Sequence, residues 1–328
     1  MLICRLLAVI LGGMLLSAFD ASAQPAARVH RIGVLDASSP DPARLDWWSA
    51  FRQQLRELGY VEGKNVALTT RFAHGKVEQL PALAEDLVRL NVHVIVTAGG
   101  FQATRAAKQA TTKIPIVMAT GADPVALGLI ASLARPGGNI TGMTSITSEL
   151  SAKRFELLRD IVPRMSRLAV LWHVNPAGEL AVRDFEAVAR SARIAPQMLG
   201  VRGVDEFEGA FAAMERERAE ALIVIVSAQF FPERKRLADL ALLHRLPTMH
   251  AQTEYVEAGG LLSYGPSYPE FFRLAAVYVD KILRGANPAE LPVAQPTRFE
   301  LVINLKTARA LGVTLPQPLL LRANRIIE

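Results

Sequence analysis

Val92–Thr97 reads VHVIVT, and Ala221–Val226 reads ALIVIV. Both runs are almost entirely apolar and rich in β-branched side chains, as is typical of strands that are covered on both faces. Such strands occur in parallel sheets, because the helices that connect parallel strands pack on both sides of them. The two runs therefore predict parallel α/β sheets.

The rest of the chain alternates strand-like runs with amphipathic helices. A helix is expected over Ala43–Leu58, with Trp48, Phe51 and Leu55 on one apolar stripe and Gly59 at its end. Two series of strands without a shared repeat predict two α/β lobes, and the absence of a Gly/Ser-rich linker suggests a hinge between them. The expected strands are 30–36, 65–72, 92–97, 114–120, 167–172, 197–201, 221–226, 247–250 and 260–264.

The N-terminus has the pattern of a secretory signal peptide. Arg5 precedes the fourteen-residue apolar run Leu6–Phe19, and Ala21-Ser22-Ala23 is a small-residue cleavage site. The run is shorter than the roughly twenty residues of a membrane span, although an uncleaved anchor helix remains the alternative. The only cysteine, Cys4, lies before the run, where no lipid would be attached. We therefore expect cleavage near Ala23 and a periplasmic protein that does not itself span the membrane.

Composition and motif searches narrow the function further. The net charge of +6 is modest and spread along the chain, without the concentrated basic stripe of a nucleic-acid-binding protein. The chain has no G-x-S-x-G, H-E-x-x-H, Walker A or G-x-G-x-x-G motif, and its histidines do not pair at metal-ligand spacing. We expect no nucleic-acid partner, no metal, no cofactor and no enzymatic activity.

Polar residues gather where the predicted strands end, which is where open parallel sheets bind ligands. These ends are rich in hydroxyls, amides and glycines and poor in paired acids and bases, a composition typical of binding a small molecule rather than transforming it. Asp123 is open to a second interpretation, as a helix N-cap with Pro124 in the first helical position. The segments concerned are 37–41, 97–100, 120–124, 142–147, 172–176, 227–231, 251–253 and 264–267.

Helical periodicity predicts different environments for the adjacent tryptophans Trp47 and Trp48. Trp48 falls on the apolar stripe and is expected in the core. Trp47 lies about 100° away around the helix, so it is expected at the surface or facing a cleft, where it could stack on a ligand.

Several segments together resemble the periplasmic substrate-binding proteins of ABC transporters that are often labelled tryptophan/tyrosine-type. The resemblance covers essentially the whole mature chain. The segments are RIGVL at 31–35, FRQQLRELGYVEGKNV at 51–66, ADPVALGLIASLARPGGNITG at 122–142, EAGGLLSYGPSY at 257–268 and QPTRFELVINLKTARALG at 295–312.

The resemblance implies a type I-like periplasmic-binding-protein fold, with two mostly parallel, helix-flanked lobes and three hinge crossings. Fitted to this chain, the crossings are expected near Thr144, Leu261 and Glu300. Lobe 1 would then comprise residues 29–144 and 262–299, and lobe 2 residues 145–261 and 300–328. A small organic ligand, an amino acid or a related carboxylate or aromatic compound, would be gripped between closing lobes.

The resemblance and the strand ends together indicate thirteen ligand-binding residues. They are Ser38, Ser39, Gly99, Gly100, Thr120, Asp123, Thr144, Ser145, Asn175, Ser227, Gln229, Gln252 and Tyr264. Two places depart from the family pattern. Ser227-Ala228-Gln229 replaces Thr-Asp-Asn, and Gln252-Thr253-Glu254 replaces Ser-Asp-Glu, so an acid that could pair with a substrate ammonium is lost at each. We therefore expect a ligand other than tryptophan or tyrosine.

The expected partners are a separate ABC permease and ATPase, with the chain itself a monomer. Two alternatives stay open from the sequence. One is a sensory ligand-binding module, which would need the same lobes. The other is a periplasmic hydrolase or isomerase, for which only Asp123, His173 and Glu254 are placed near strand ends.

Overall fold

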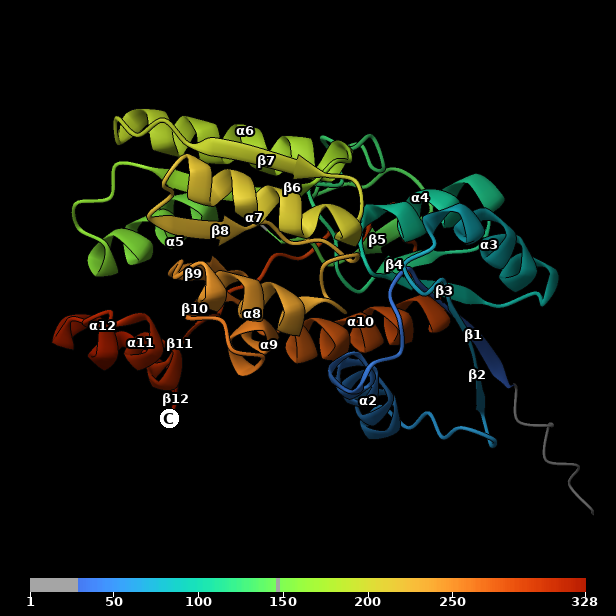
Figure 1. The fold of residues 1–328 in the computed structure, drawn as a ribbon. Coiled ribbons are helices and arrows are strands. Elements are labelled where there is room, and N and C mark those ends of the chain that lie inside the picture. Colours follow the sequence, from blue (N-terminus) through green and yellow to red (C-terminus); the bar gives the residue numbers. More distant parts are fainter. Residues whose placement is uncertain (1–28, 146–147) are drawn as a thin grey trace, which may run out of the picture.

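The computed structural model describes residues 29–145 and 148–328, so the expected signal peptide lies outside the described residues. The chain forms two sheets with helices on both faces (Figure 1). The first has the strand order β2-β1-β3-β4-β5, and the second has the order β12-β11-β10-β9-β8-β6-β7. The two-lobed α/β fold expected from the sequence is therefore confirmed.

The first sheet is entirely parallel. Its strands are β1 (His30–Asp36), β2 (Val66–Phe72), β3 (Val94–Ala98), β4 (Ile116–Met118) and β5 (Ile140–Gly142). Helices α2 (Pro42–Glu57) and α10 (Tyr268–Leu283) lie side by side on one face. The turn η1 (Val77–Gln79) leads into α3 (Leu80–Arg89), which packs beside α4 (Phe101–Ala110). We call this sheet and these helices the first lobe.

The second sheet is parallel except at β10 and β11, which pair antiparallel. Its strands are β6 (Leu168–His173), β7 (Gln197–Val201), β8 (Ala221–Val224), β9 (Thr248–His250), β10 (Leu262–Pro266), β11 (Phe299–Asn304) and β12 (Arg325–Ile327). The helices of this second lobe are α5 (Ser148–Ile161), α6 (Pro176–Ser191), the turn η2 (Val204–Glu206), α7 (Phe207–Arg216), α8 (Arg234–Leu243), α9 (Thr253–Glu257), α11 (Leu305–Leu311) and α12 (Gln317–Arg322).

Alternate side chains of the central strand β8 lie on opposite faces of the second sheet and pack into different hydrophobic clusters. In β8, Leu222 and Val224 join a cluster that includes side chains of α7 and α8, whereas Ala221 and Ile223 join a cluster with α5 and α6. The first of these clusters continues into the first lobe, where it includes Trp47, Trp48 and Phe51 of α2. One continuous apolar core therefore runs along the same side of both sheets.

The chain passes between the sheets three times. It leaves the first sheet after β5, returns between β10 and α10, and leaves again before β11. From the sequence, the second crossing is expected near Leu261, with residues 262–299 in lobe 1. In the structure, Leu262–Pro266 pairs with β9 and β11 in the second sheet, so the crossing comes after Pro266. The strand itself was expected, but its sheet depends on partners distant in sequence.

Three strands were not expected from the sequence: β5, β11 and β12. β5 and β12 are only three residues long, so neither carries a period-2 pattern that sets it apart from a loop. Among residues 29–145 and 148–328, no helix combines the length and the apolar character needed to cross a membrane.

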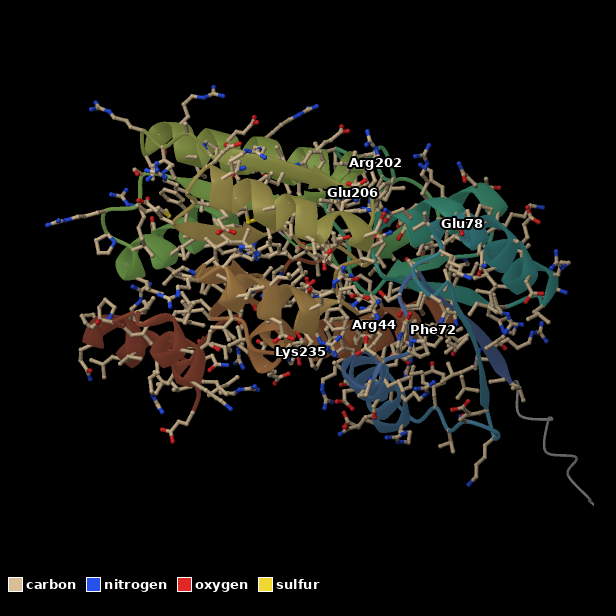
Figure 2. All side chains as sticks on the ribbon, in the orientation of Figure 1. Arg44, Phe72, Glu78, Arg202, Glu206 and Lys235 are labelled. Atoms are coloured by element: carbon tan, nitrogen blue, oxygen red, sulfur yellow. The ribbon has the colours of Figure 1, made fainter. Side chains whose placement is uncertain are left out.

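Charged side chains lie mostly outside, with Arg44 an exception (Figure 2). Lys235 on α8 is exposed, and so is Arg202 after β7, whose backbone N–H donates to Glu206. Arg44 on α2 is only 3% exposed and lies in the interior. This buried arginine is next to the candidate site.

Candidate functional site

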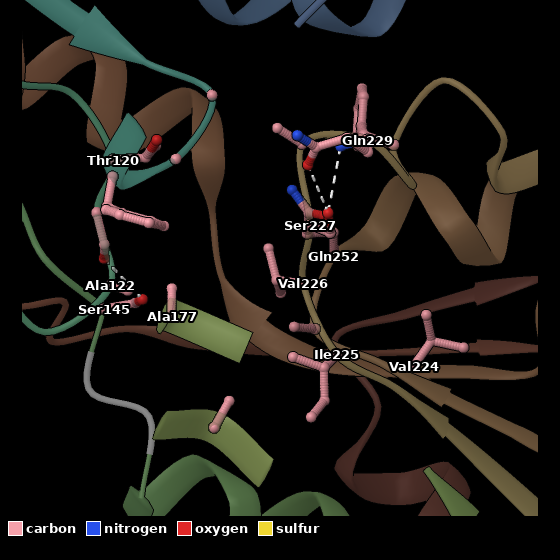
Figure 3. Close-up of a pocket in the computed structure, with 18 of the residues that line it drawn as sticks. Thr120, Ala122, Ser145, Ala177, Val224, Ile225, Val226, Ser227, Gln229 and Gln252 are labelled. Atoms are coloured by element: carbon pink, nitrogen blue, oxygen red, sulfur yellow. Dashed lines mark hydrogen bonds between the residues drawn. The ribbon is translucent and has the colours of Figure 1, made fainter. Parts of the chain in front are cut away.

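A pocket lies between the two lobes, at the carboxyl ends of strands from both sheets (Figure 3). The first lobe contributes the segments that follow β1, β3, β4 and β5, and the second lobe those that follow β6, β8, β9 and β10. Both sheets contain the doubly wound order 2-1-3-4-5, in which ligands bind where the strand order reverses. In the first sheet this point lies between β1 and β3, and in the second between β6 and β8.

The first-lobe wall is built around Gly99 and Gly100, between β3 and α4. A Cβ atom on Gly99 would lie 2.7 Å from Asp36 Oδ1 and 2.8 Å from the Ala37 backbone N, and its φ of +80° favours glycine. Gly100 is the N-cap residue of α4 and supplies no side-chain cap. The glycines therefore let the β1 and β3 ends approach each other, and the N-terminus of α4, without a side-chain cap, lines the pocket.

Arg44 lines the pocket, but its charge is already neutralised. Its Nε donates to Asp36 Oδ2 at 2.7 Å and its Nη2 to Asp36 Oδ1 at 2.9 Å. Asp36 is completely buried and also accepts from Trp48 Nε1 at 2.8 Å and from the Ser38 backbone N–H at 2.9 Å. This network fixes the β1 end against α2.

The second-lobe wall carries neutral hydrogen-bonding groups. Asn175 Oδ1 accepts from the Gly178 N–H at 2.9 Å and so caps α6. The Ser227 hydroxyl donates to Gln229 Oε1 at 2.8 Å, and the two side chains lie together at the pocket edge (Figure 3). Gln252 is buried, and its Oε1 has no partner among the described residues. An unpaired acceptor of this kind is available to a donor on a ligand.

Arg154 lines the same pocket from α5 in the second lobe. It is only 9% exposed, and its Nε donates to the Tyr264 carbonyl at 2.7 Å. No carboxylate among the described side chains forms an ion pair with it. Burial lowers the pKa of Arg154 to about 10, which still leaves the side chain charged at neutral pH.

Besides further hydroxyl and amide side chains, among them Gln102, Thr120 and Ser151, the lining has a large apolar part. The aromatic residues are Phe101, Phe185, Phe231, Tyr268 and Phe271, and the aliphatic wall is Ile223–Val226. Among the described residues, no Asp, Glu, Lys or His lines the pocket. In the same part of the chain, no group of three or more His, Cys, Asp or Glu residues is placed to hold a metal ion.

The structure brings nine of the thirteen sequence candidates to this pocket. They are Ser38, Gly99, Gly100, Thr120, Ser145, Asn175, Ser227, Gln229 and Gln252.

The other four candidates, Ser39, Asp123, Thr144 and Tyr264, do not line the pocket. Asp123 Oδ1 accepts from the backbone N–H groups of residues 125 and 126, in agreement with the capping interpretation. The Thr144 hydroxyl donates to the carbonyl of residue 122 at 2.9 Å. Tyr264 lies against Phe299, with 5.9 Å between ring centroids. Asp123, Thr144 and Tyr264 therefore make local or core contacts instead.

The thirteen sequence candidates do not include the two arginines that line the pocket. Their positions on apolar helix stripes could have indicated them. Arg44 falls on the α2 stripe formed by Trp48, Phe51 and Leu55, and Arg154 falls on the apolar stripe of α5. A charged residue in an apolar stripe has either a buried partner or a ligand, since an unpaired buried charge is costly.

Trp47 differs from its expected position at the surface or in a cleft. It is 1% exposed, stacks on Tyr268 with 4.8 Å between ring centroids, and donates from Nε1 to Glu254 Oε1 at 2.7 Å. It does not line the pocket. Packing of the second lobe and α10 against α2 covers this side of the helix, which helical periodicity alone could not reveal.

The three residues considered for an enzyme are not brought together in the pocket. Asp123 caps a turn, and Glu254 accepts from Trp47. His173 contacts the Arg202 carbonyl at 3.3 Å and Asn175 Nδ2 at 2.6 Å, and burial lowers its pKa. None of the three lines the pocket.

A cleft between two doubly wound lobes, lined by polar strand ends from both, defines a two-lobed solute-binding protein. The chain belongs to the ABC transporter substrate binding protein family, whose model matches residues 32–327. This agrees with the resemblance read from the sequence.

The chain is also similar to individual proteins of known name or structure. The chain is 23% identical, over 264 residues, to the tyrosine-binding protein of Clostridioides difficile (strain R20291), covering 80% of this chain and 75% of that protein. A crystal structure of a conserved domain protein from Vibrio cholerae is 26% identical, with a TM-score of 0.86 over 91% of this chain and 100% of that one. The ABC domain from Streptococcus pneumonia in complex with L-Trp is 24% identical, with a TM-score of 0.85 and the same coverage.

Proposed function

We propose that this chain is the solute-binding component of an ABC importer and captures a small organic ligand between its two lobes. The observation that carries the proposal is the composition of the pocket wall. Hydroxyls, amides and helix N-termini from the strand ends of both lobes face one space. A ligand held there touches both lobes, so it favours the closed arrangement by its differential affinity for that state.

Closure is proposed to occur about the three chain crossings. The lobes are then residues 29–142 with 268–294, and residues 148–266 with 299–328, joined by the segments between them. Contacts across the lobes accompany closure. Arg234 Nη2 lies 3.2 Å from Asp41 Oδ1, and Trp47 donates to Glu254. These contacts add to the stability of the closed arrangement without touching the ligand.

The N-terminal sequence pattern and the family support three further parts of the proposed function. The chain is released into the periplasm after signal-peptide cleavage near Ala23, acts as a monomer, and delivers its ligand to separate permease and ATPase chains. It acts by binding and release, without chemistry on the ligand. The dispersal of Asp123, His173 and Glu254 away from the pocket supports this.

The test uses the mature protein, stripped of co-purified ligand by unfolding and refolding. It is screened by thermal shift against amino acids, small carboxylates, purines and aromatic acids. A ligand at a hundred times its Kd should add about 2.7 kcal/mol to stability. Small-angle scattering with each hit should show a smaller radius of gyration.

Two variants make the test specific to the pocket. Ala177→Trp fills space next to the pocket, where Ala177 lies in Figure 3, and should abolish both the shift and the compaction. Ala212→Trp, at an exposed position of α7, is the matched control and should behave as the wild type. Binding without compaction, or binding that survives Ala177→Trp, would contradict the proposal.

A further inference from the structure

The charge balance of the pocket is unusual for a site that would hold an amino acid. The two lining arginines differ in how their charges are compensated. Arg44 is paired with Asp36 through two hydrogen bonds. Arg154 is also buried, at 9% exposed, but among the described residues its one hydrogen bond goes to a neutral carbonyl, that of Tyr264. Among the described residues, the pocket wall therefore carries one uncompensated positive charge.

The terminal nitrogens of Arg154 are free to bind a ligand. Nε is used by the Tyr264 carbonyl, whereas Nη1 and Nη2 have no partner in the described part of the chain. A buried guanidinium without an acceptor costs free energy, and a carboxylate meets its paired donors with two parallel hydrogen bonds. A ligand carboxylate in the pocket would thus supply the counter-charge and the acceptors that Arg154 lacks among the described residues.

An ammonium group would meet the opposite situation. Three acidic side chains near the pocket already have partners: Asp36 pairs with Arg44, Asp41 with Arg234, and Glu254 accepts from Trp47. One oxygen each of Asp41 and Glu254 stays unpaired among the described residues, but it is buried away from the pocket wall. None of them lines the pocket. A ligand ammonium would be buried beside an arginine with only neutral acceptors, which is unfavourable for a desolvated cation.

The remaining wall indicates the body of the ligand. Four phenylalanines, Phe101, Phe185, Phe231 and Phe271, line the same pocket as Arg154. The segment Ile223–Val226 adds an aliphatic surface. Such a wall favours an apolar body, aromatic rings above all, over a sugar or a dicarboxylate.

We propose that this pocket binds a small aromatic monocarboxylate that lacks an α-ammonium group, with its carboxylate paired to Arg154. The inference rests on the proposed solute-binding function and names the ligand class of the same site. Aromatic acids of the arylacetate and arylpropionate type have this chemistry.

The first experiment measures binding by calorimetry to the refolded wild-type protein, with matched probes. The pairs are 3-phenylpropionate with L-phenylalanine, and indole-3-propionate with L-tryptophan. Each acid should bind at least about tenfold more tightly than its amino acid, which is the effect of about 1.4 kcal/mol for the buried ammonium. The methyl ester of 3-phenylpropionate, which lacks the negative charge, should also bind at least about tenfold more weakly than the acid.

The second experiment tests Arg154 itself. Arg154→Met removes the charge at similar length and should weaken binding of the acids by about 10- to 100-fold, while ester binding stays the same. Arg154→Lys keeps the charge without the paired donors and should fall between. Arg159→Met, on an exposed position of the same helix, is the control and should bind as the wild type.

A purely structural role for Arg154 predicts a different result. Arg154→Met would then lower the melting temperature of the unliganded protein and weaken acid and ester alike. Our proposal requires that acid binding falls while ester binding is kept, because only the acid pairs with the guanidinium.

The outcomes distinguish a wrong ligand class from a wrong solute-binding function. Amino acids that bind as tightly as the matched acids, with compaction, would overturn the ligand class and leave the solute-binding function standing. A wider screen in which no compound at all causes a shift or compaction would overturn both.

Discussion

Asp36 and Arg44 form an ion pair that is almost completely removed from water. Asp36 is 0% exposed and Arg44 3% exposed, and both carboxylate oxygens accept additional hydrogen bonds, from Trp48 and from the Ser38 backbone. A buried pair is compensated only while both partners are present. Loss of one partner leaves the other as an isolated buried charge.

We predict that Asp36→Asn lowers the free energy of unfolding by about 3–5 kcal/mol, because Arg44 stays buried without its counter-charge. Urea unfolding monitored by tryptophan fluorescence measures this loss. The control is Asp86→Asn, which removes a pair with Arg71 in which both side chains are about a third exposed. Water screens that pair, so its loss should be clearly smaller. Equal losses for the two variants would contradict the argument.

His250 is a second buried residue, and its environment determines its pKa. It is 2% exposed, stacks on Tyr255 with 4.7 Å between ring centroids, and neither ring nitrogen has a hydrogen-bond partner in the described part of the chain. Burial lowers the pKa of His250 from 6.5 to about 3. Between pH 6.5 and about pH 3, His250 therefore binds a proton in the unfolded state but stays neutral in the native state.

This difference predicts acid destabilisation with a defined sign. Above pH 6.5, His250 is neutral in both states and does not lower the free energy of unfolding. As the pH falls from 6.5 toward 3, the free energy of unfolding decreases by up to about 1.4 kcal/mol per pH unit. His250→Phe keeps a ring against Tyr255 and cannot be protonated. Urea unfolding at pH 7.5 and pH 4.5 should show a smaller loss for the variant than for the wild type. Identical losses would mean that His250 is protonated in the folded protein.

At the scale of elements, β10 is held against the segment after β9 by a close backbone approach. A Cβ atom on Gly265 would lie 2.0 Å from the Ala251 carbonyl oxygen. Backbone atoms cannot rotate away, so any side chain there must push β10 from its neighbour. The next residue, Pro266, lines the pocket and precedes the crossing to α10.

We predict that Gly265→Ala destabilises the protein by about 1–3 kcal/mol, because one methyl group is forced into filled space. Gly209→Ala is the matched control within α7, where nothing lies within 4 Å of the added Cβ. It should stabilise the protein by about 0.5–1 kcal/mol, since alanine is the better helix former. Thermal unfolding of both variants gives the two signs. Stabilisation by both would show that the β9–β10 approach is not tight.

At the scale of the whole molecule, a polar contact links the lobes inside an apolar environment. Trp47 of α2 donates to Glu254 of α9, and Trp47 also packs against Phe231 and Tyr268. Burial raises the pKa of Glu254 above its ordinary value of 4.5, and its Oε2 has no partner among the described residues. The carboxylate form is therefore the less favourable one in this arrangement.

We predict that Glu254→Gln stabilises the protein at neutral pH, because the amide keeps an acceptor for Trp47 without a buried charge. For a carboxyl whose folded pKa is raised, the stabilising contribution is complete below 4.5 and is lost as the pH rises through the raised pKa. The gain in melting temperature should therefore be present at pH 7.5 and vanish toward pH 4. Glu62→Gln, at an exposed position, should show no such pH-dependent gain. A gain that is the same at both pH values would exclude this cause.

Local patterns were enough to predict most elements and much of the pocket. The β1 and β7 strands have the bounds expected from the sequence, and nine of thirteen site candidates reach the pocket because strand ends in parallel sheets meet at one edge. Asp123 and Thr144 show the limit of this reasoning. Both follow the correct strands, but their side chains are used by neighbouring backbone groups. Their orientation depends on turns that residue type alone does not specify.

Sequence by itself determined the two α/β lobes and placed the candidate pocket at the strand ends, because hydrophobic period and turn residues act over a few neighbours. The family followed from the resemblance of whole segments, such as 122–142 and 295–312. Only the tertiary structure decided that Leu262–Pro266 joins the second sheet and that Trp47 is covered. The same holds for the charges: Arg44 finds Asp36, whereas Arg154 finds no acid among the described side chains. Strand partners, burial and ion pairing join residues far apart in the chain, and these contacts exist only once both lobes have packed.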